Sequence, residues 1–511
     1  MPGLKRRDFL RGIAVASLAT PLPAVVGASA SAQEPQRIRH EASSPEGRQM
    51  LLTYREAVKR MKARPHHDPH SWRFQANIHG VPPDEDIDKI FDVNQTSDPA
   101  ERDRILQHRT LALGTPSQRR VWATCTHGHP HFLTWHRMYM HNFERIVERI
   151  VGAPFALPYW DYLDASRRSL PETFREIVDG AQTNNALWFD ERKAGMSDLT
   201  SPAALDRFDV AVSAPFGQRQ LLETSDQLGF SGELEDTPHG AVHLAIGTPR
   251  GMGWPPLAAR DPIFWLHHAN LDRLWESWRL APPPGAPPRD PIDPEWLGQE
   301  YAFVGPQSTR VVMSARGVLS TADLGYRYDR LEPMAPAPFA VAANQPGPFS
   351  AGAGQQMLAR SDAAGAPAVT LGSREARVKL RATATPFSAN RALTDPRTTV
   401  KLVLNNILVS EDPGVQFDVY VSPASGPEVT ARGLRVGKLN LFGTGPHTLP
   451  GEHAHGAPSS RVRPLDITEF VRRRWIDLST PGDFEVTIVP DRPRPEAPVV
   501  TIGEVMIIAR P

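Results

Sequence analysis

A change in hydrophobic period divides this chain, and it constrains the fold more than any other feature. Between about residues 45 and 280, apolar residues recur at helical spacing. Beyond residue 369 they alternate in short runs, such as VKLVLNNILV and FEVTIVP, each bounded by Gly, Pro, Asn or Asp. The helical period places apolar side chains on one face of a helix, and the alternating period places them on one face of a sheet. We therefore expect the two parts to form separate cores, one helical and one of strands. We therefore predict an α+β multidomain chain, with a mainly helical domain followed by an all-β sandwich.

A stretch without either period separates the two parts. Residues 334–368 are rich in Ala, Pro and Gly, a composition typical of an exposed linker. Upstream, the run Pro282-Pro283-Pro284 ends the helical pattern, and a connecting region follows it. The predicted order is a helical domain with its connecting region over 33–333, the linker over 334–368, and the β-sandwich over 369–511.

Residues 1–32 resemble a twin-arginine export signal. Arg6 and Arg7 precede Asp8-Phe9-Leu10, and an apolar stretch and two Ala-Ser-Ala cleavage sequences follow. A membrane anchor is the alternative, but Pro21 and Pro23 interrupt the apolar stretch, which is short for a span. We expect export by the twin-arginine route to the periplasm or outside the cell, with no membrane contact after the signal is removed.

Charge and cysteine content exclude several kinds of partner and site. Lys and Arg number 57, and so do Asp and Glu, so the chain has no net field that would hold a nucleic acid or an anionic membrane. Cys125 is the single cysteine, which excludes an intrachain disulfide and any cysteine-based zinc or iron–sulfur site. A metal site in this chain would therefore use mostly the nitrogens of its 18 histidines.

Three histidine-bearing segments suggest such a site. In TPHGAVHLAIG, Thr237 can cap a helix that Pro238 opens, and His239 and His243 then lie one turn apart on one face. Two imidazoles at that spacing can hold one metal ion. The i, i+4 spacing makes each of these two histidines a stronger ligand candidate than a single histidine would be.

The other two segments place histidines on or beside longer helices. In DPIFWLHHANLDRLW, His268 shares a helix face with apolar residues. In CTHGHPHFLTWHRMYMHNFE, His127 lies in a loop, and His136 lies near the start of a helix that Thr134 can cap and Gly152 can stop. Neutral imidazoles suit copper, zinc and nickel, so three nitrogens per metal with an open position would make a reactive site.

The alternative for any one of these residues is structural. A single histidine on an apolar face is more often a core residue bonded to the backbone than a ligand. His267 adjoins His268 and would point elsewhere on the helix, so we expect it to support the ligands rather than bind metal. We expect the remaining histidines of the motifs and loops to be solvated or supporting: His66, His67, His70, His129, His131, His141, His453 and His455.

Together the segments resemble the two copper signatures of tyrosinases and catechol oxidases. His127 with the following FLTWHR resembles the first signature, and DPIFW with His268 and Asp272 resembles the second. Further patches, from about residue 70 to the end, are similar to plant-type polyphenol oxidases: QANIHG, LPYWDY, EDTPHGAVH, DPEWL, Tyr326-x-Tyr328 and VQFDVYV. The export signal makes this a bacterial-looking version of the plant type.

The resemblance implies two copper ions inside a four-helix bundle. By motif position, copper A would be held by His79, His127 and His136, and copper B by His239, His243 and His268. The step from His79 to His127 is longer than usual in the family, which leaves His108 as the alternative first ligand.

The resemblance assigns further roles around the copper pair. Cys125 would form a thioether with His127, as in fungal tyrosinases. Glu235 would orient a water that deprotonates monophenols, but the asparagine that accompanies this glutamate in plant enzymes is Gly240 here. We therefore expect catechols to be oxidised faster than monophenols.

Three residues would shape the surroundings of the site. Asp272 lies one turn after His268 and would accept a hydrogen bond from a ligand imidazole. Trp254 and Pro255 fall where many plant enzymes carry a gating Phe, which implies a more open entrance.

The activity implied is oxidation of o-diphenols, together with hydroxylation of monophenols, to o-quinones by dioxygen. A haemocyanin-like oxygen carrier would use the same six histidines and is the main alternative, whereas a two-metal hydrolase would need carboxylate ligands that the motifs lack. The β domain resembles the shielding domain of plant enzymes, so cleavage within 334–368 is expected to raise activity. The oligomeric state is left open.

Overall fold

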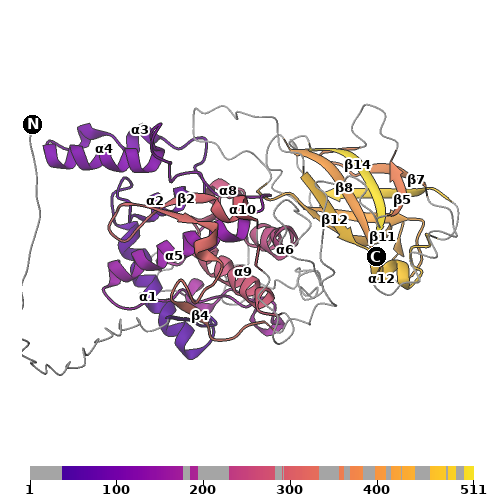
Figure 1. Ribbon diagram of the computed structural model, residues 1–511, viewed down its shortest axis with the longest axis horizontal. Helices are drawn as coiled ribbons and strands as arrows, with labels where there is room; N and C mark the ends of the chain where they lie inside the picture. Colours follow the sequence, from indigo (N-terminus) through magenta and orange to yellow (C-terminus); the bar gives the residue numbers. More distant parts are fainter. Residues whose placement is uncertain are drawn as a thin grey trace, which may run out of the picture.

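The computed structural model describes residues 37–176, 185–193, 230–281, 290–291, 293–332, 356–361, 369–383, 398–409, 416–426, 429–443, 461–478, 482–490 and 500–510. Helices form one end of the molecule and a β-sheet domain forms the other (Figure 1). The predicted export signal lies outside the described residues, so that prediction rests on the sequence alone.

Helices occur where the sequence predicted helical spacing. Short polar residues begin several of them, since the side chains of Ser44, Ser71 and Asp98 each accept a hydrogen bond from a backbone N–H of the first turn. The helices of this part are α1 (Pro45–Lys62), α2 (Trp72–His79), α3 (Ile87–Ile90), α4 (Pro99–Leu113), α5 (Phe132–Val151), α6 (Phe230–Leu234), α7 (Ala241–Ile246), α8 (Pro255–Ala258), α9 (Ile263–Arg279) and α10 (Pro294–Gly298). Within the described residues, no helix combines the length and apolar character that a membrane span needs.

Helix α5 ends as predicted but begins earlier. Gly152 adopts the left-handed conformation, with φ of 70°, and its N–H donates to the carbonyl of Glu148. The helix starts at Phe132, so Thr134 lies inside the first turn rather than at the cap. This start places His136 one turn into the helix, with its side chain buried.

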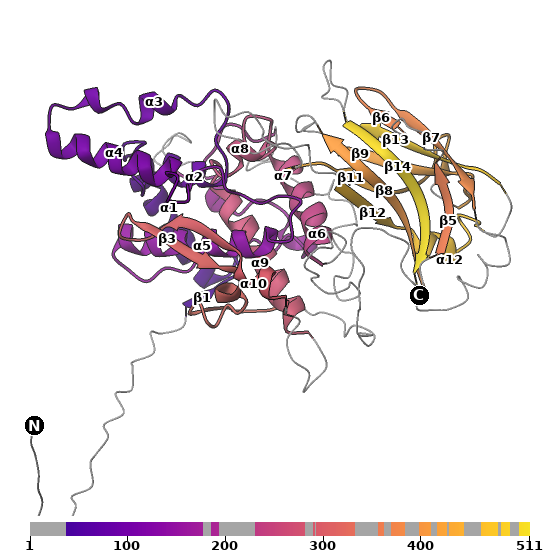
Figure 2. The same ribbon diagram turned by 45° about the horizontal axis from the view of Figure 1, so that its top comes forward.

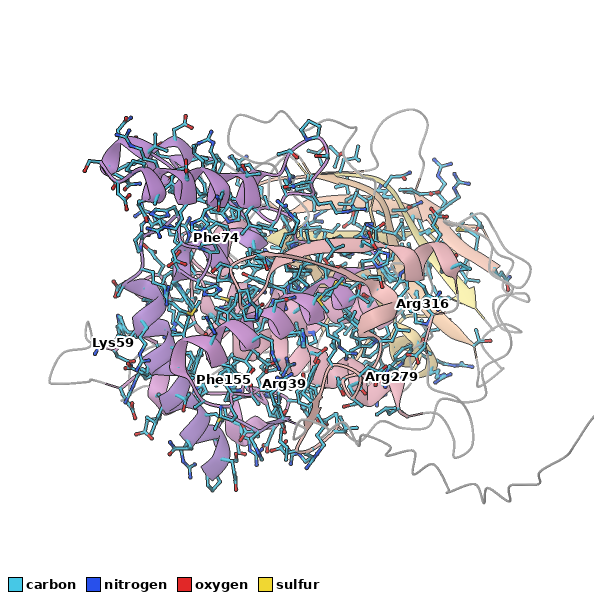
Figure 3. All side chains as sticks on the ribbon, turned by 60° about the vertical axis from the view of Figure 1, so that its left-hand side comes forward. Arg39, Lys59, Phe74, Phe155, Arg279 and Arg316 are labelled. Carbon is cyan, nitrogen blue, oxygen red and sulfur yellow. The ribbon has the colours of Figure 1, made fainter. Side chains whose placement is uncertain are left out.

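Aromatic side chains hold the helices together. The rings of Phe143 on α5 and Trp265 on α9 stack with centroids 3.5 Å apart, and the hydroxyl of Tyr54 on α1 donates to the carbonyl of Pro262 just before α9. Figure 3 shows this packed interior, with Arg39 among its side chains and the exposed Lys59 at its edge. Two small sheets border it: β1 (Arg37–Arg39) runs parallel to β4 (Tyr326–Tyr328), and β2 (Glu300–Val304) pairs antiparallel with β3 (Arg310–Ser314).

The carboxy-terminal part forms, among the described residues, one ten-stranded sheet in the order β10-β11-β9-β13-β7-β5-β14-β8-β12, with β6 beside β14. Its elements are β5 (Gln356–Ser361), β6 (Val369–Leu371), β7 (Ala376–Ala382), β8 (Thr399–Val409), β9 (Gln416–Ser422), β10 (Val429–Thr430), β11 (Gly433–Asn440), β12 (Arg461–Asp466), the short helix α12 (Thr468–Arg472), β13 (Phe484–Pro490) and β14 (Val500–Arg510). The sheet folds over on itself, so that strands from opposite ends of the strand order come together. A Cβ at Gly437 of β11, near one end, would lie 3.2 Å from Leu465 of β12 at the other end. A large apolar core fills the fold, beside a smaller cluster of Val403, Met506 and Ile508, so the predicted fold class is confirmed.

One part of the predicted linker is a strand. Residues Gln356–Ser361 form β5, which pairs antiparallel with β14 and β7. The Ala and Gly content of the whole 334–368 stretch concealed this short apolar run. The rest of the predicted linker lies outside the described residues.

Candidate metal centre

Five helical segments and one loop carry the predicted ligands into the helical part. Their positions are the end of α2 for His79, the loop before α5 for His127, α5 for His136, the turn between α6 and α7 for His239, α7 for His243 and α9 for His268. None of these six side chains is more than 5% exposed. Burial of so many imidazoles calls for partners that satisfy their nitrogens.

The helix that carries His239 differs from the predicted one. It begins at Phe230, and Glu235–Gly240 form a π-helical turn between α6 and α7, with Pro238 inside it. Proline has no N–H, and in an α-helix its ring collides with the carbonyl four residues earlier, so a wider turn accommodates it. Thr237 and Pro238 therefore do not begin a helix, and the wider turn, a feature frequent at functional sites, carries both Glu235 and His239.

His79, His127 and His136 lie together with Cys125. The possible ligand atoms of these four residues are all within 4.8 Å of one another. His108, the alternative first ligand, lies on α4, where its Nδ1 is 3.5 Å from Nδ1 of His67. The structure thus brings together the three histidines predicted for copper A and places His108 outside their group.

His239, His243, His267 and His268 form a second group, whose ligand atoms also lie within 4.8 Å of one another. The Nε2 atoms of His243 and His268 are 3.4 Å apart. Two nitrogens bound to one ion at about 2.0 Å with tetrahedral geometry would lie roughly 3.3 Å apart, so this spacing suits a shared metal ion.

The two groups face each other. The rings of His136 and His268 stack with centroids 4.2 Å apart and planes 6° apart, and the centroids of His127 and His239 are 5.4 Å apart. Among the described residues, neither group includes a carboxylate. The arrangement is therefore a set of imidazole nitrogens around a place for two ions.

Backbone carbonyls fix the tautomers of four of these histidines. In each, Nδ1 donates to a carbonyl oxygen: His79 to Pro255 at 2.9 Å, His136 to Phe132 at 2.7 Å, His239 to Glu235 at 3.0 Å and His243 to Met252 at 2.9 Å. Because a carbonyl can only accept, Nδ1 carries the proton, and the metal-binding lone pair is on Nε2.

Burial keeps the imidazoles neutral and leaves them suited to a metal. Desolvation by burial lowers the pKa of His239, His243 and His268 well below the ordinary 6.5, and nearby imidazoles lower it further. The buried Nε2 of His239 has no hydrogen-bond partner among the described residues, and a metal ion would supply one. Neutral imidazoles without carboxylates fit copper, so the residues present fit a copper pair.

His267 lies closer to the site than the sequence suggested. Its ring is nearly parallel to that of His239, with centroids 5.7 Å apart, and it is 5.0 Å from the ring of His243. Adjacent positions on a helix point about 100° apart, so His267 and His268 approach the group from two sides. The spacing of residues along α9 could not predict the approach of His267 to His239 and His243, because that approach depends on how α9 packs against the π-helical turn.

Cys125 is buried beside two of the copper A histidines. Its Sγ is 3.6 Å from Nδ1 and 3.8 Å from Nε2 of His127, nearly equidistant from the two nitrogens that flank one ring carbon. It is also 3.4 Å from Nε2 of His136. Burial raises the pKa of this thiol well above its ordinary value. The thioether with His127 stays a prediction.

Glu235 is buried and joins the π-helical turn to the loop that carries His127. Its carboxylate accepts a hydrogen bond from the backbone N–H of Gly128, and its own carbonyl accepts one from His239. These contacts tie the π-helical turn that carries His239 to the loop that carries His127. Its role in orienting a water stays a prediction.

Residues 440–443, which we call the closing loop, comprise the last residue of β11 and the three residues after it, and they reach the histidines from the β domain. Phe442 stacks on His243, with centroids 4.1 Å apart and planes 15° apart, and its ring is 5.5 Å from that of His239 and 5.7 Å from that of His127. Figure 2 shows β11 on the side of the β domain that faces α6 and α7. Phe442 packs in the apolar core of the helical domain, although the chain places it in the β domain.

Asp272 has other partners than the predicted imidazole. Its carboxylate accepts hydrogen bonds from Arg137 at 2.5 Å, Arg39 at 3.0 Å, Tyr326 at 2.6 Å and Tyr328 at 2.5 Å. These donors come from α5, β1 and β4 and occupy both carboxylate oxygens. Asp272 therefore ties α9 to neighbouring elements instead of orienting a ligand, a correction that one-turn spacing on α9 could not reveal.

Trp254 and Pro255 do not line a wide entrance. Pro255 is buried, and its carbonyl accepts the hydrogen bond from His79, so it supports a ligand from behind. Trp254 is half-buried and precedes α8. Phe442 covers the copper B histidines, so the more open entrance that the sequence suggested is filled in this structure.

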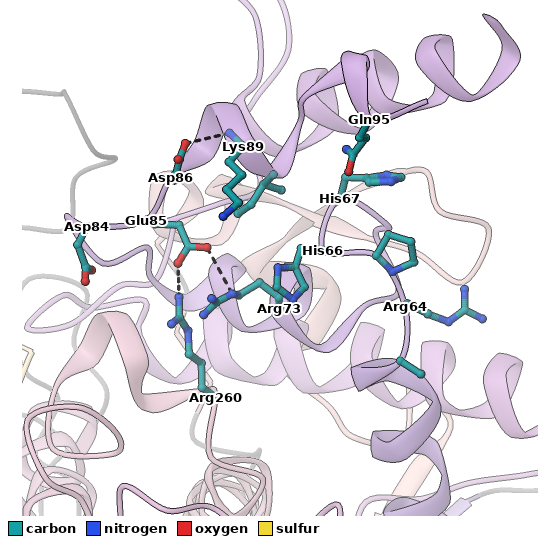
Figure 4. Close-up of a pocket in the computed structure, with 13 residues that line it drawn as sticks. Arg64, His66, His67, Arg73, Asp84, Glu85, Asp86, Lys89, Gln95 and Arg260 are labelled. Carbon is teal, nitrogen blue, oxygen red and sulfur yellow. Dashed lines mark hydrogen bonds and ion pairs between the residues drawn. The ribbon is translucent and has the colours of Figure 1, made fainter. Parts of the chain in front are cut away.

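An open hollow of about 730 Å³ lies apart from the histidine groups (Figure 4). Its lining includes His66, His67 and Glu85, and no member of either histidine group. Glu85 is 3.3 Å from Arg73 and 2.5 Å from Arg260, so this carboxylate is already paired. We assign this hollow no part in the chemistry.

Comparison with known proteins agrees with the geometry. Residues 69–281 match the family model described as the common central domain of tyrosinase, and residues 350–510 match a domain of unknown function. The chain is 28% identical over 491 residues to a tyrosinase of Hahella sp. (strain CCB-MM4), which covers 89% of this chain and 96% of that protein. It is 26% identical over 487 residues to a chloroplastic polyphenol oxidase of Malus domestica, which covers 86% of this chain and 72% of that protein.

Solved structures share the fold over both parts of the chain. Latent apple tyrosinase matches with a TM-score of 0.58 and 23% identity over 94% of this chain and 98% of that one. A functional unit of octopus hemocyanin matches with a TM-score of 0.52 and 16% identity over 93% of this chain and 100% of that one. The paired histidine groups, the family model and the near full-length similarity to a tyrosinase agree, so residues 69–281 carry the central domain of tyrosinase, and the whole chain is similar to tyrosinases and plant-type polyphenol oxidases.

Proposed function

We propose that this protein oxidises o-diphenols to o-quinones with dioxygen, at a binuclear copper centre. The tyrosinase central domain, the similar tyrosinase and polyphenol oxidase, and the two histidine groups support an oxidoreductase with two copper ions and a phenolic substrate in general terms. The observation that carries the proposal is the aromatic ring of Phe442, stacked on His243 between the two histidine groups. The site therefore accepts a flat aromatic ring at the place where copper would meet a substrate.

Six histidines would hold the metal ions: His79, His127 and His136 for one, and His239, His243 and His268 for the other. The copper pair, when bound, supplies the electron transfer that turns two o-diphenols and one dioxygen into two o-quinones and two waters. The chain orients the imidazoles through backbone carbonyls and surrounds them with apolar rings, such as Phe132 against His239 at 4.7 Å and Phe264 against His79 at 4.9 Å. These rings exclude water from the centre.

The position of Phe442 also supports a latent state. A phenol that stacks on His243 would have to occupy the space that Phe442 fills, so the closed chain would exclude it. Intramolecular tethering gives the closing loop a high effective concentration, and even a weak contact then keeps the site closed. Opening would need cleavage of the connection between the domains or displacement of the loop.

The preference for catechols over monophenols is part of the proposal. It rests on Gly240, which lacks the amide that accompanies Glu235 in plant relatives. A catechol needs only the loss of two electrons and two protons, whereas a monophenol must lose two hydrogens and also gain an oxygen atom on its ring. A site with one polar group at the water position serves the first reaction better.

Oxygen uptake with catechol and with phenol, before and after cutting, tests the proposal. A protease site inserted between positions 334 and 355 of the full chain should, once cut, raise catechol oxidation many-fold at unchanged copper content. Phe442→Ala in the uncut chain should also raise it, whereas Val429→Ala on the exposed surface of β10 should not.

Two outcomes would contradict the proposal. Reversible oxygen binding without o-quinone after a confirmed cut would favour the haemocyanin-like alternative. Equal catechol oxidation before and after the cut would show that Phe442 does not block the site.

A further inference from the structure

Gly240, the residue after His239, lies against the closing loop. A Cβ built on Gly240 would be 2.0 Å from Nδ2, 2.7 Å from Cγ and 2.9 Å from Oδ1 of Asn440. Side-chain carbons essentially never approach other heavy atoms so closely. The amide of Asn440 therefore fills the space that any side chain at position 240 would need.

Asn440 cannot move aside without disturbing the closing loop. Its side chain is 4% exposed, and its Oδ1 accepts a hydrogen bond from the backbone N–H of Phe442 at 2.9 Å. In such a turn the side chain sets the course of the backbone two residues on. Asn440 thus links the contact at Gly240 to the placement of the Phe442 ring.

A second glycine completes the contact from the other side. Gly443 has φ of 74°, a conformation that favours glycine, and a Cβ there would lie 2.5 Å from Cγ of His127. The closing loop therefore touches the π-helical turn through Asn440 and the His127 loop through Gly443. Phe442 lies between these two contacts.

We infer that Gly240 is a docking position for the β domain, where the lack of a side chain forms a notch that receives the Asn440 amide and seats Phe442 over the copper B histidines. The inference rests on the proposed function, in which the closing loop blocks the phenol site. The docking surface is the π-helical turn, and its partner is the Asn-Leu-Phe-Gly turn of the same chain.

Docking gives Gly240 a different role from the one that the resemblance suggests. The resemblance treats this glycine as the loss of an amide that would help deprotonate monophenols. In the docking role, position 240 must carry no side chain, because the Asn440 amide occupies the space that a side chain would need. The two roles differ in the effect of alanine, which adds a methyl group without an amide.

Gly240→Ala and Gly240→Asn in the copper-loaded full chain separate these roles. Docking predicts that both variants speed hydrogen exchange in the peptide that covers residues 440–443, and raise uncut oxidation of both catechol and phenol several-fold. Gly298→Ala is the matched control, because a Cβ at Gly298 would meet no atom within 4 Å. We expect it to change neither exchange nor oxidation.

A second arm uses Asn440→Ala, which withdraws the three atoms that crowd position 240. In the Asn440→Ala background, Gly240→Ala should speed hydrogen exchange at residues 440–443 much less than it does in the parent chain, because the added methyl group then has room. An equal effect in both backgrounds would overturn the inference, since the methyl group would then act on the helix of His239 itself. Copper content checks that each variant is folded around its metal.

The outcomes also separate this inference from the proposed function. Unchanged exchange in Gly240→Ala overturns the docking role, whether or not cleavage activates the chain. If only Gly240→Asn raises oxidation, and only that of phenol, both before and after cutting, the docking role is overturned in favour of the amide role. If cutting leaves oxidation unchanged, the closing loop does not block the phenol site. The hydrogen-exchange data still decide whether Gly240 is the docking position.

Discussion

At the scale of single residues, the backbone aligns the ligands of this site. Four imidazoles donate Nδ1–H to carbonyl oxygens at 2.7–3.0 Å. Such hydrogen bonds fix the ring orientation and raise the basicity of the metal-binding nitrogen. His79 receives this support from Pro255, whereas the Nδ1 of His108 faces that of His67. The hydrogen-bond partner thus supports His79 over His108 as the candidate ligand.

We expect His79→Ala to lower bound copper from two ions per chain to about one, because one three-nitrogen set loses a ligand. His108→Ala, the matched control, should keep both ions. Copper measured by atomic absorption after desalting decides between them. Loss of copper in the His108 variant with retention in the His79 variant would reverse the assignment.

At the scale of elements, Asp272 joins four parts of the helical domain. It accepts hydrogen bonds from Arg137 on α5, Arg39 on β1 and two tyrosines of β4. Burial alone would raise the pKa of Asp272, but the two arginines and the tyrosine hydroxyls outweigh it and hold the pKa below the ordinary 3.8. The ionised carboxylate is therefore part of what holds α9 in place.

Asp272→Asn should lower the free energy of unfolding by about 3 kcal/mol at pH 7, because it removes one partner of a buried ion pair. A carboxylate whose pKa is lowered by folding stabilises above its unfolded pKa, near 3.9, and this contribution is lost as the pH falls through the lower folded pKa. Urea unfolding from pH 7 to pH 3 should thus show the difference from the parent shrinking only below about pH 4.

The control for this prediction is Glu56→Gln on α1. Glu56 pairs with Arg60 at 2.7 Å, but both side chains are about half exposed. Its loss should change the free energy of unfolding by less than about 1 kcal/mol. A difference between Asp272→Asn and the parent that persists undiminished to pH 3 would show that the packing of Asp272, not its charge, is what stabilises.

At the scale of the whole molecule, each domain has its own main apolar core, and the two domains meet at the closing loop. The helical core and the β-domain core are separate, and Phe442 joins the helical one. All six predicted ligands lie in the helical domain. Metal binding should therefore stabilise one domain and leave the stability of the other unchanged.

We expect copper removal by a chelator to lower the unfolding temperature of the helical domain and not that of the β domain. At free copper 100 times the Kd, each ion contributes about 2.7 kcal/mol, so two ions contribute about 5.4 kcal/mol, or roughly 10–20 °C for a domain of this size. Calorimetry of the full chain should show two transitions, of which the chelator shifts one. Equal shifts of both would mean that the domains unfold as one unit.

The sequence by itself determined the two-part fold and the candidate ligands, because both are local properties. The helical spacing around His136 and the i, i+4 pair of His239 and His243 are visible in a few residues, and helices and strands form wherever such periods persist. Some local predictions from the sequence were nevertheless wrong. Pro238 signalled a helix start but lies inside a π-helical turn, and the short apolar run of β5 was hidden in a stretch rich in Ala and Gly.

Only the tertiary structure decided which distant residues meet. The turn of His267 toward the copper B group, the arginines and tyrosines around Asp272, and the seating of Asn440 on Gly240 all join segments from different elements. No periodicity encodes these contacts, because they depend on how whole helices and the β domain pack once their apolar faces are buried. The candidate metal ligands can thus be predicted from the sequence, whereas the contact of Phe442 with them depends on how the two domains pack.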